Sequence, residues 1–393
     1  MLKTYWLGIA VLLIACQSNT KKNEPSPKDS IVKDSPKEIK ATTNNKIPVD
    51  AQWNRMCLLL SGNAKEIDAI QTNQEIWKNY ANQSNEKWNV LNQRIAKPIS
   101  NWTNQKNYEN KSCKTLLYPF AGGDFFYAHL FFPNVDTTIM IGLEPPGYLF
   151  NPDTCSATNL NNYLNNLEKS LFYPHKLGFF RTLSMETDFQ KGLLNGTIHT
   201  CLYYLSKFGN NVHYIKAFNI DENGNISNEV NLGNKAHFKK GFRIGYSSPT
   251  DNQVKELIYY TANLSNSGLQ SETGEKHNGL AKFLNAKRNT MSFFKAASYL
   301  MYNSYFSTIR DISLNHSKVI LQDDSGMPYT ALNNGGFDVE FLGDYSRTIG
   351  LFKHRFQPKM KTLYDSLSPQ KLPFTIGYNA EFGECNLQLA KKK

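Results

Sequence analysis

The sequence contains few of the features that identify common classes of enzyme. Its 393 residues include only six cysteines, and none of them forms a Cys-x-x-Cys pair, which argues against a zinc cluster. The chain has no Gly-x-Ser-x-Gly, GxxxxGK[ST], GxGxxG or HExxH motif. It also lacks an apolar run long enough to cross a bilayer. We therefore expect no metal ion and no cofactor, and none of the familiar hydrolase, nucleotide-binding or metalloprotease signatures is present.

Positive charge is abundant but is not concentrated in one place. The chain has 44 basic and 33 acidic residues, and its formal net charge is +11. Such an excess can indicate nucleic acid or an anionic surface as a partner. The basic residues are spread along the chain, apart from Lys391, Lys392 and Lys393 at its end, and no helix-turn-helix or RNP-like pattern accompanies them. We therefore expect no nucleic-acid partner.

The N-terminus has the pattern of a secretion signal. Lys3 gives a positive start, and residues 6–14 form an apolar stretch that is too short to span a bilayer. Residues 13–16, Leu-Ile-Ala-Cys, resemble the lipobox of bacterial lipoproteins, although Ile14 replaces the usual small residue. The resemblance implies cleavage before Cys16 and acylation (palmitate among the acyl chains) of this cysteine, which anchors the mature chain to a membrane. Gln17 is not the Asp that retains such proteins in the inner membrane, so the outer membrane is expected.

Composition divides the chain into three parts. Residues 17–50 are rich in Lys, Pro, Ser and Asn and contain few large apolar side chains, so they cannot bury enough surface to become ordered. We predict a signal peptide at residues 1–15, a flexible tether at residues 16–50 and one large ectodomain at residues 51–393.

The longest aromatic and aliphatic run, residues 116–147, is the predicted centre of the core. It is interpreted as three strands, at residues 116–120, 125–132 and 138–143, separated by tight turns. The last of these is apolar without alternation, which is typical of a central strand covered on both faces.

Hydrophobic periodicity predicts the remaining elements. Helical spacing predicts two helices within residues 53–102 and further helices at residues 156–171, 193–208, 280–302, 305–314 and 360–367. Strands are predicted at residues 212–220, 242–246, 257–264, 319–322, 337–342, 374–378 and 385–389. Helices and strands come in clusters without strict alternation, so the predicted class is α+β, with a mainly antiparallel mixed sheet flanked by helices. A doubly wound α/β/α arrangement is the second choice.

Cysteine pairing cannot be deduced from the spacing. Five cysteines remain besides Cys16, an odd number in an oxidising compartment, so at most two disulfides can form. They are Cys57, Cys113, Cys155, Cys201 and Cys385. His199 lies two residues before Cys201, but side chains at this spacing on a helix diverge, and we expect no metal site there.

The candidate site residues are acids, and one base, near the ends of predicted strands: Asp124, Glu144, Arg181, Asp323 and Asp324. Paired carboxylates can perform acid/base or glycosidase chemistry when burial raises one pKa, and Glu144 is the predicted acid. Arg181 could bind an anionic group with both of its terminal nitrogens. The alternative is that the acids occupy turns because Asp and Glu suit turns. We expect a binding or envelope-structural role with an unidentified protein or glycan partner, and the alternative is a hydrolase acting on an envelope glycan or similar polar substrate.

Several segments resemble an ectodomain of bacterial lipoproteins and envelope proteins to which no activity is assigned. They are YPFAGGDFFYAHLFFPN, GLEPPG, FFRT, SFFKAASYLM and LQDDSGMPY, and the resemblance covers residues 77–390. It implies one continuous globular unit and no particular chemistry.

Overall fold

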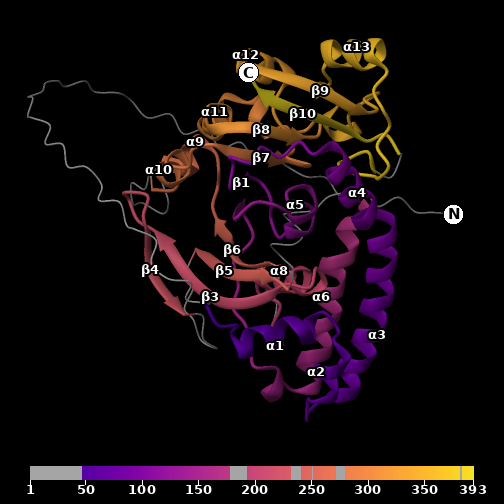
Figure 1. The fold of residues 1–393 in the computed structure, drawn as a ribbon, viewed down its shortest axis with the longest axis vertical. Coiled ribbons are helices and arrows are strands. Elements are labelled where there is room, and N and C mark those ends of the chain that lie inside the picture. Colours follow the sequence, from indigo (N-terminus) through magenta and orange to yellow (C-terminus); the bar gives the residue numbers. More distant parts are fainter. Residues whose placement is uncertain (1–46, 178–192, 232–239, 250, 271–278, 381–382) are drawn as a thin grey trace, which may run out of the picture. The chain divides into compact units, whose positions relative to one another are not determined.

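The computed structural model describes residues 47–177, 193–231, 240–249, 251–270, 279–380 and 383–393. The predicted signal peptide, Cys16, most of the predicted tether and Arg181 lie outside the described residues. Residues 46–393 form one compact unit, which Figure 1 shows as a ribbon.

The centre of this unit is a sheet in which ten described strands pair in the order β4-β3-β5-β6-β2-β1-β7-β8-β10-β9. The strands are β1 (Thr115–Tyr118), β2 (Thr137–Gly142), β3 (Asn211–Ile220), β4 (Ile226–Asn231), β5 (Gly241–Ser248), β6 (Asp251–Thr261), β7 (Thr290–Phe294), β8 (Ser317–Gln322), β9 (Phe337–Gly343) and β10 (Asn386–Lys392). The four pairings from β6 to β8 are parallel, and the five outer pairings are antiparallel. This mixed, mainly antiparallel sheet confirms the predicted α+β class. Its parallel centre also has the doubly wound arrangement that was the second choice in the sequence analysis.

Helices cover both faces of the sheet because each central strand is apolar on both sides. In β1, Leu116 and Tyr118 belong to one core cluster and Leu117 to the other. The first face is covered by α1 (Ala51–Leu60), α2 (Ala64–Asp68), α3 (Gln74–Leu91), α4 (Lys97–Lys106), α5 (Phe125–Phe131), α6 (Ala157–Leu177) and α8 (Ile198–Lys207). The second is covered by α9 (Asn266–Gln270), α10 (Gly279–Asn285), α11 (Ser307–His316) and α12 (Tyr329–Asn334), while α13 (Pro358–Leu367) packs on β9.

The prediction for residues 125–132 was wrong, because these residues form helix α5 and not a strand. Phe125, Phe126 and Tyr127 are all buried, so this helix has no polar face to reveal its period in the sequence. The Asp124 side chain caps the helix by accepting the N–H of Tyr127. As a result β1 and β2 are parallel strands joined by a helix, and they do not form a hairpin.

Two other predictions also failed. Residues 280–302, predicted as one helix, divide into α10 and β7. All five residues of β7 are buried, so a strand covered on both faces was mistaken for a buried helix. Residues 374–378 form no strand. A π-helical turn (Asn92–Ala96) joins α3 to α4, so the helical segment continues past Pro98, the second residue of α4.

Several predictions are confirmed. Helix α6 lies where the leucine pattern predicted a helix, and Gly209 follows α8 with a φ of 78°. Strands β5 and β6 pair antiparallel, with Phe242 opposite Tyr259.

Two further features are findings of the structure and not tests of these predictions. The five described cysteines are free thiols. In the described part of the chain we find no helix that is both long and apolar enough to cross a membrane.

Candidate functional site

The order of the parallel strands reverses between β1 and β7. From β1 the chain passes through α5, on the first face, to β2 on one side of β1. It later returns from β6, through α10 on the second face, to β7 on the other side of β1. Neighbouring strands whose connections leave to opposite sides create a crevice at their carboxyl ends, and ligands of doubly wound sheets bind there.

Five charged residues follow the carboxyl ends of four adjacent parallel strands. Asp124 follows β1, Glu144 follows β2, Lys295 follows β7, and Asp323 and Asp324 follow β8. Each of the five is at most 3% exposed. The structure thus places four of the predicted site residues at one edge of the sheet, which we call the carboxyl edge. Arg181 lies outside the described residues.

Lys295 is the functional residue that the sequence analysis missed. Its Nζ lies 2.8 Å from Oδ2 of Asp124 and 3.8 Å from the centre of the Tyr127 ring. The signal in the sequence was a lysine directly after the buried run Thr-Met-Ser-Phe-Phe, but a helix was predicted for that segment. Lysine is almost never fully buried unless it is paired, so a lysine at the end of a buried strand indicates a buried partner of opposite charge.

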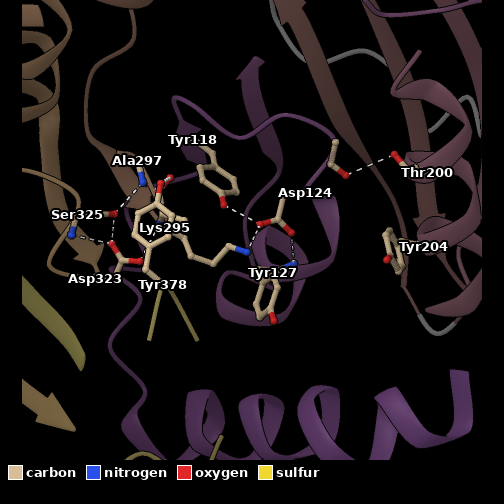
Figure 2. A network of polar contacts seen from close by, with 12 residues as sticks. Tyr118, Asp124, Tyr127, Thr200, Tyr204, Lys295, Ala297, Asp323, Ser325 and Tyr378 are labelled. Atoms are coloured by element: carbon tan, nitrogen blue, oxygen red, sulfur yellow. Dashed lines mark hydrogen bonds and ion pairs between the residues drawn. The ribbon is translucent and has the colours of Figure 1, made fainter. Parts of the chain in front are cut away.

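The Asp124 carboxylate has three hydrogen-bonding partners, and it joins the turn after β1 to the turn after β7 (Figure 2). Besides Lys295, the Tyr118 hydroxyl donates to Oδ2 over 2.8 Å, and the Tyr127 N–H donates to Oδ1 over 3.4 Å. Burial raises the pKa of Asp124, and the Lys295 ammonium offsets part of this rise. The pair is therefore a buried ion pair with its remaining lone pairs occupied.

Glu144 lies against the glycine turn that follows β1. A Cβ atom on Gly122, whose φ is 54°, would be 2.8 Å from Oε1 of Glu144. A Cβ atom on Gly142 would be 2.5 Å from Oε2. Only glycine fits at these two positions while the carboxylate lies between them. The main-chain oxygen of Glu144 accepts hydrogen bonds from the Tyr259 and Thr261 hydroxyls, over 2.7 and 2.6 Å.

The turn after β7 has a strained backbone. Ala296, Ser298 and Tyr299 have φ values of 50°, 54° and 55°, which non-glycine residues rarely adopt. Strain of this kind persists only where surrounding contacts hold it, and it is concentrated at functional sites. We call residues 295–299 the β7 turn.

The turn after β8 holds the β7 turn in place (Figure 2). Oδ2 of Asp323 accepts the N–H of Ala296, and Oγ of Ser325 accepts the N–H of Ala297, over 2.8 and 2.7 Å. The main-chain oxygen of Ser325 accepts the N–H of Tyr299 over 2.9 Å. The Tyr378 hydroxyl donates to the Ala296 carbonyl over 2.8 Å.

Asp323 and Asp324 are adjacent buried acids with separate partners. Asp323 also accepts the N–H and hydroxyl of Ser325 on Oδ1. Asp324 accepts the Asn386 amide over 3.0 Å on one oxygen and the Tyr299 hydroxyl on the other. Burial raises the pKa of both acids. For Asp324, the neighbouring Asp323 charge adds to this effect, and its pKa is raised to about 7.

A surface hollow of about 370 Å³ lies between the start of α1 and residues 150–153, and it is lined by Trp53, Arg55 and Phe150 among others. None of the five charged residues of the carboxyl edge lines it.

No protein-family model matches the chain, and no curated protein matches it. The fold and the site define a mixed-sheet domain whose doubly wound parallel centre carries buried charges at its switch point. Any assignment of function depends on the chemistry of that edge.

Proposed function

We propose that the globular part of this chain binds a phosphate-free, positively charged nucleoside at the carboxyl edge. Numbered along the chain, the parallel strands β1, β2, β6, β7 and β8 lie in the order third, second, first, fourth, fifth. This is the strand order of doubly wound dinucleotide-binding folds. In those folds the turn after the first strand is rich in glycine, and an acid about 20 residues further on binds the ribose hydroxyls.

The observation that carries the proposal is the contact between the Glu144 carboxylate and Gly122. Gly122 and Gly123 occupy the turn after β1, and Glu144 follows about 20 residues later at the end of β2. A turn without side chains allows a ligand to approach the backbone, and a carboxylate can accept two hydroxyl protons from one ribose. The residues present therefore fit the nucleoside half of such a ligand.

The same turn argues against phosphate groups. In dinucleotide-binding folds the pyrophosphate lies at the N-terminus of the helix that follows the glycine turn. Here that position is capped by the Asp124 carboxylate, and α5 has only seven residues. The Tyr127 N–H at this helix start already donates to the Asp124 carboxylate, so a nucleoside without phosphates is favoured over a dinucleotide.

Charge and topology together favour a cationic ligand. Four of the five charged residues placed at this edge are acidic. In addition, β10 is antiparallel and lies between β8 and β9. This arrangement is characteristic of S-adenosylmethionine-dependent methyltransferases, a likeness of fold alone. S-adenosylmethionine is a phosphate-free nucleoside with a sulfonium charge, and when bound it supplies an electrophilic methyl group.

The residues of the chain have distinct tasks in this proposal. Glu144 binds the ribose hydroxyls, the turn at Gly122 allows close approach, and the Asp124–Lys295 pair fixes the adjoining turns. Glu144 is fully buried, and the segment after it is held by N–H groups of Thr197 and Ile198 that donate to Pro145 and Pro146. A ligand can reach the carboxylate only when neighbouring groups move, so we expect binding to be accompanied by a local change at residues 145–150 and 195–198.

Thermal unfolding of the full chain with different nucleosides tests the proposal. S-adenosylmethionine should stabilise the protein, by about 2.7 kcal/mol at a concentration one hundred times Kd, whereas NAD and ATP should not. S-adenosylhomocysteine, which lacks the sulfonium charge, should stabilise it less at the same concentration. Glu144→Gln should abolish the stabilisation, because the amide is a poorer acceptor for two hydroxyl groups.

The matched control is Glu340→Gln, an exposed acid on β9 that pairs with Lys106. This variant should respond to the nucleosides as the wild type does. The proposal fails if neither S-adenosyl compound stabilises the wild type, or if Glu144→Gln still responds.

The N-terminal sequence supports a lipid anchor at Cys16, so we propose that this domain works at the outer membrane. Wild-type cells should incorporate labelled palmitate into the protein, and cells expressing Cys16→Ser should not. Label that persists in the variant would show that anchoring depends on another residue.

The hydrolase alternative has less support, because Asp124 is occupied by Lys295 and Tyr118 and none of these acids lines the described surface hollow.

A further inference from the structure

The β7 turn carries Lys295 at its first position and three strained residues directly after it. A turn of this kind relaxes unless its N–H groups are held from outside. We infer that Asp323 is the positioning residue of the carboxyl edge: its carboxylate holds the β7 turn in the strained form that brings Lys295 to Asp124. The consequence for ligand binding rests on the proposed function, whereas the effect on Lys295 does not.

Both oxygens of Asp323 are committed to this task. Oδ2 accepts the N–H of Ala296, the first strained residue, and Oδ1 accepts two protons from Ser325. Ser325 in turn accepts the N–H groups of Ala297 and Tyr299, so the turn is held at three of its residues. A carboxylate has acceptors on both arms, and no amide or hydroxyl side chain offers the same set.

Gly377 leaves room for this carboxylate. A Cβ atom on Gly377 would be 2.8 Å from Oδ2 of Asp323, and the φ of 77° at this position also favours glycine. The adjacent Tyr378 donates its hydroxyl proton to the Ala296 carbonyl over 2.8 Å. The segment at residues 377–378 therefore fits around Asp323 and the strained residue together.

The effect of Asp323 reaches Asp124 through Lys295. Lys295 immediately precedes Ala296, so the direction of the lysine side chain depends on the backbone that Asp323 holds. The lysine crosses from the β7 turn to the start of α5 and neutralises the carboxylate beside the glycine turn. Losing this geometry would leave a buried charge next to the place where the nucleoside would lie.

The test uses competitive acetylation of the full chain, with mass spectrometry reporting the reactivity of each lysine. Asp323→Asn replaces one acceptor with an amide NH₂, which cannot accept the N–H of Ala296 or of Ser325. Releasing one residue from its positive φ shifts the equilibrium between the strained and the relaxed form of the β7 turn by about tenfold. Lys295 should therefore be acetylated about ten times faster, and S-adenosylmethionine should bind about ten times more weakly. The partly buried Lys207, bonded to Asn85, should keep its reactivity and so exclude general unfolding.

A second background separates positioning from a general structural role. Ala296→Gly with Ser298→Gly removes the strain at two of the three residues with positive φ and leaves it at Tyr299. In this background Asp323→Asn should change the reactivity of Lys295 by less than about threefold, because less strain remains to be held. A role in packing alone would give the same effect in both backgrounds. Asp311→Asn, at an exposed position on α11, is the matched control and should change nothing.

The outcomes are distinct. If Asp323→Asn leaves the reactivity of Lys295 unchanged, or acts equally in the glycine background, the inference is wrong. If Lys295 responds as expected but the wild type binds no S-adenosylmethionine, the positioning role stands and the proposed function fails.

Discussion

Two regions of one sheet differ in how deeply their charged side chains are buried. In the antiparallel wing formed by β3, β4, β5 and β6, the Arg243 guanidinium lies between Glu229 and Glu256, and all three side chains are 18–29% exposed. At the carboxyl edge the side chains of Asp124 and Lys295 are 1% and 2% exposed. Solvent screens the wing pairs, whereas the edge pair bears the full cost of desolvation. A buried ion pair adds little to stability compared with well-packed apolar residues, so a gain in stability does not by itself account for the position of this pair at the switch point.

The backbone shows the same contrast. Among the described residues of the wing, the non-glycine residue with a positive φ is Asn228, and asparagine tolerates this conformation well. In the two turns that flank the switch point, the residues with a positive φ are instead Phe120, Ala296, Ser298 and Tyr299. The fold therefore concentrates both charge burial and backbone strain where β1 and β7 end.

The largest effect should follow from breaking the edge pair on one side only. Lys295→Met would leave the Asp124 carboxylate buried without its cation, so the free energy of unfolding should fall by about 3–5 kcal/mol. Urea unfolding monitored by the tryptophan fluorescence measures it.

The double variant Asp124→Asn with Lys295→Met is the control for this loss. It removes both charges, and it should recover more than half of the stability lost in Lys295→Met. A loss below about 1 kcal/mol in the single variant would mean that the edge pair behaves like a surface pair, and the comparison would collapse.

A smaller effect should appear on changing the pH. The pKa of Asp324 is about 7 in the folded chain, above its ordinary value near 3.8. Between these values the folded state keeps a proton that the unfolded state releases, so stability falls as the pH rises and levels off above about 7. The slope is about 1.4 kcal/mol per pH unit, which gives a loss of about 2 kcal/mol between pH 5.5 and pH 7.

Asp324→Asn isolates this contribution, because the amide cannot ionise. Its oxygen can still accept the Tyr299 hydroxyl. Relative to this variant, the wild type should lose about 2 kcal/mol as the pH rises from 5.5 to 8, as judged by urea unfolding at each pH. Parallel pH profiles for the two proteins would contradict the raised pKa.

The acids of the carboxyl edge could be predicted from the sequence, but the strand order that brings them together could not. Asp124, Glu144, Asp323 and Asp324 could be found because each follows an apolar run that ends in a turn. Lys295 was missed because β7 is buried on both faces, and a short buried strand has no periodicity that distinguishes it from a helix. The parallel order could not be predicted for the same reason, since the buried aromatic helix α5 was interpreted as a strand and turned a crossover into a hairpin.

Strand partners distant in the sequence were equally hidden. β1 pairs with β7, and β2 with β6, across more than a hundred residues that include the whole wing. Local patterns specify that a strand is covered on both faces, but not which strand lies beside it. Only part of the wing could be predicted: β5 and β6 form a hairpin that joins neighbours in the sequence, whereas strand β4 was not predicted.

The smallest effect should come from the wing. Arg243→Ala should reduce the free energy of unfolding by only about 0.2–1 kcal/mol, because the pair is partly solvated and its partners keep other contacts. Glu256 still accepts the Tyr214 hydroxyl over 2.7 Å, and Glu229 still pairs with Lys216 over 3.0 Å. Urea unfolding under the same conditions gives the loss of unfolding free energy for both variants. We expect the loss in Lys295→Met to be at least about three times the loss in Arg243→Ala. An equal loss in the two variants would show that burial of charge does not distinguish the edge from the wing, and the main structural argument for a binding site at the switch point would then be lost.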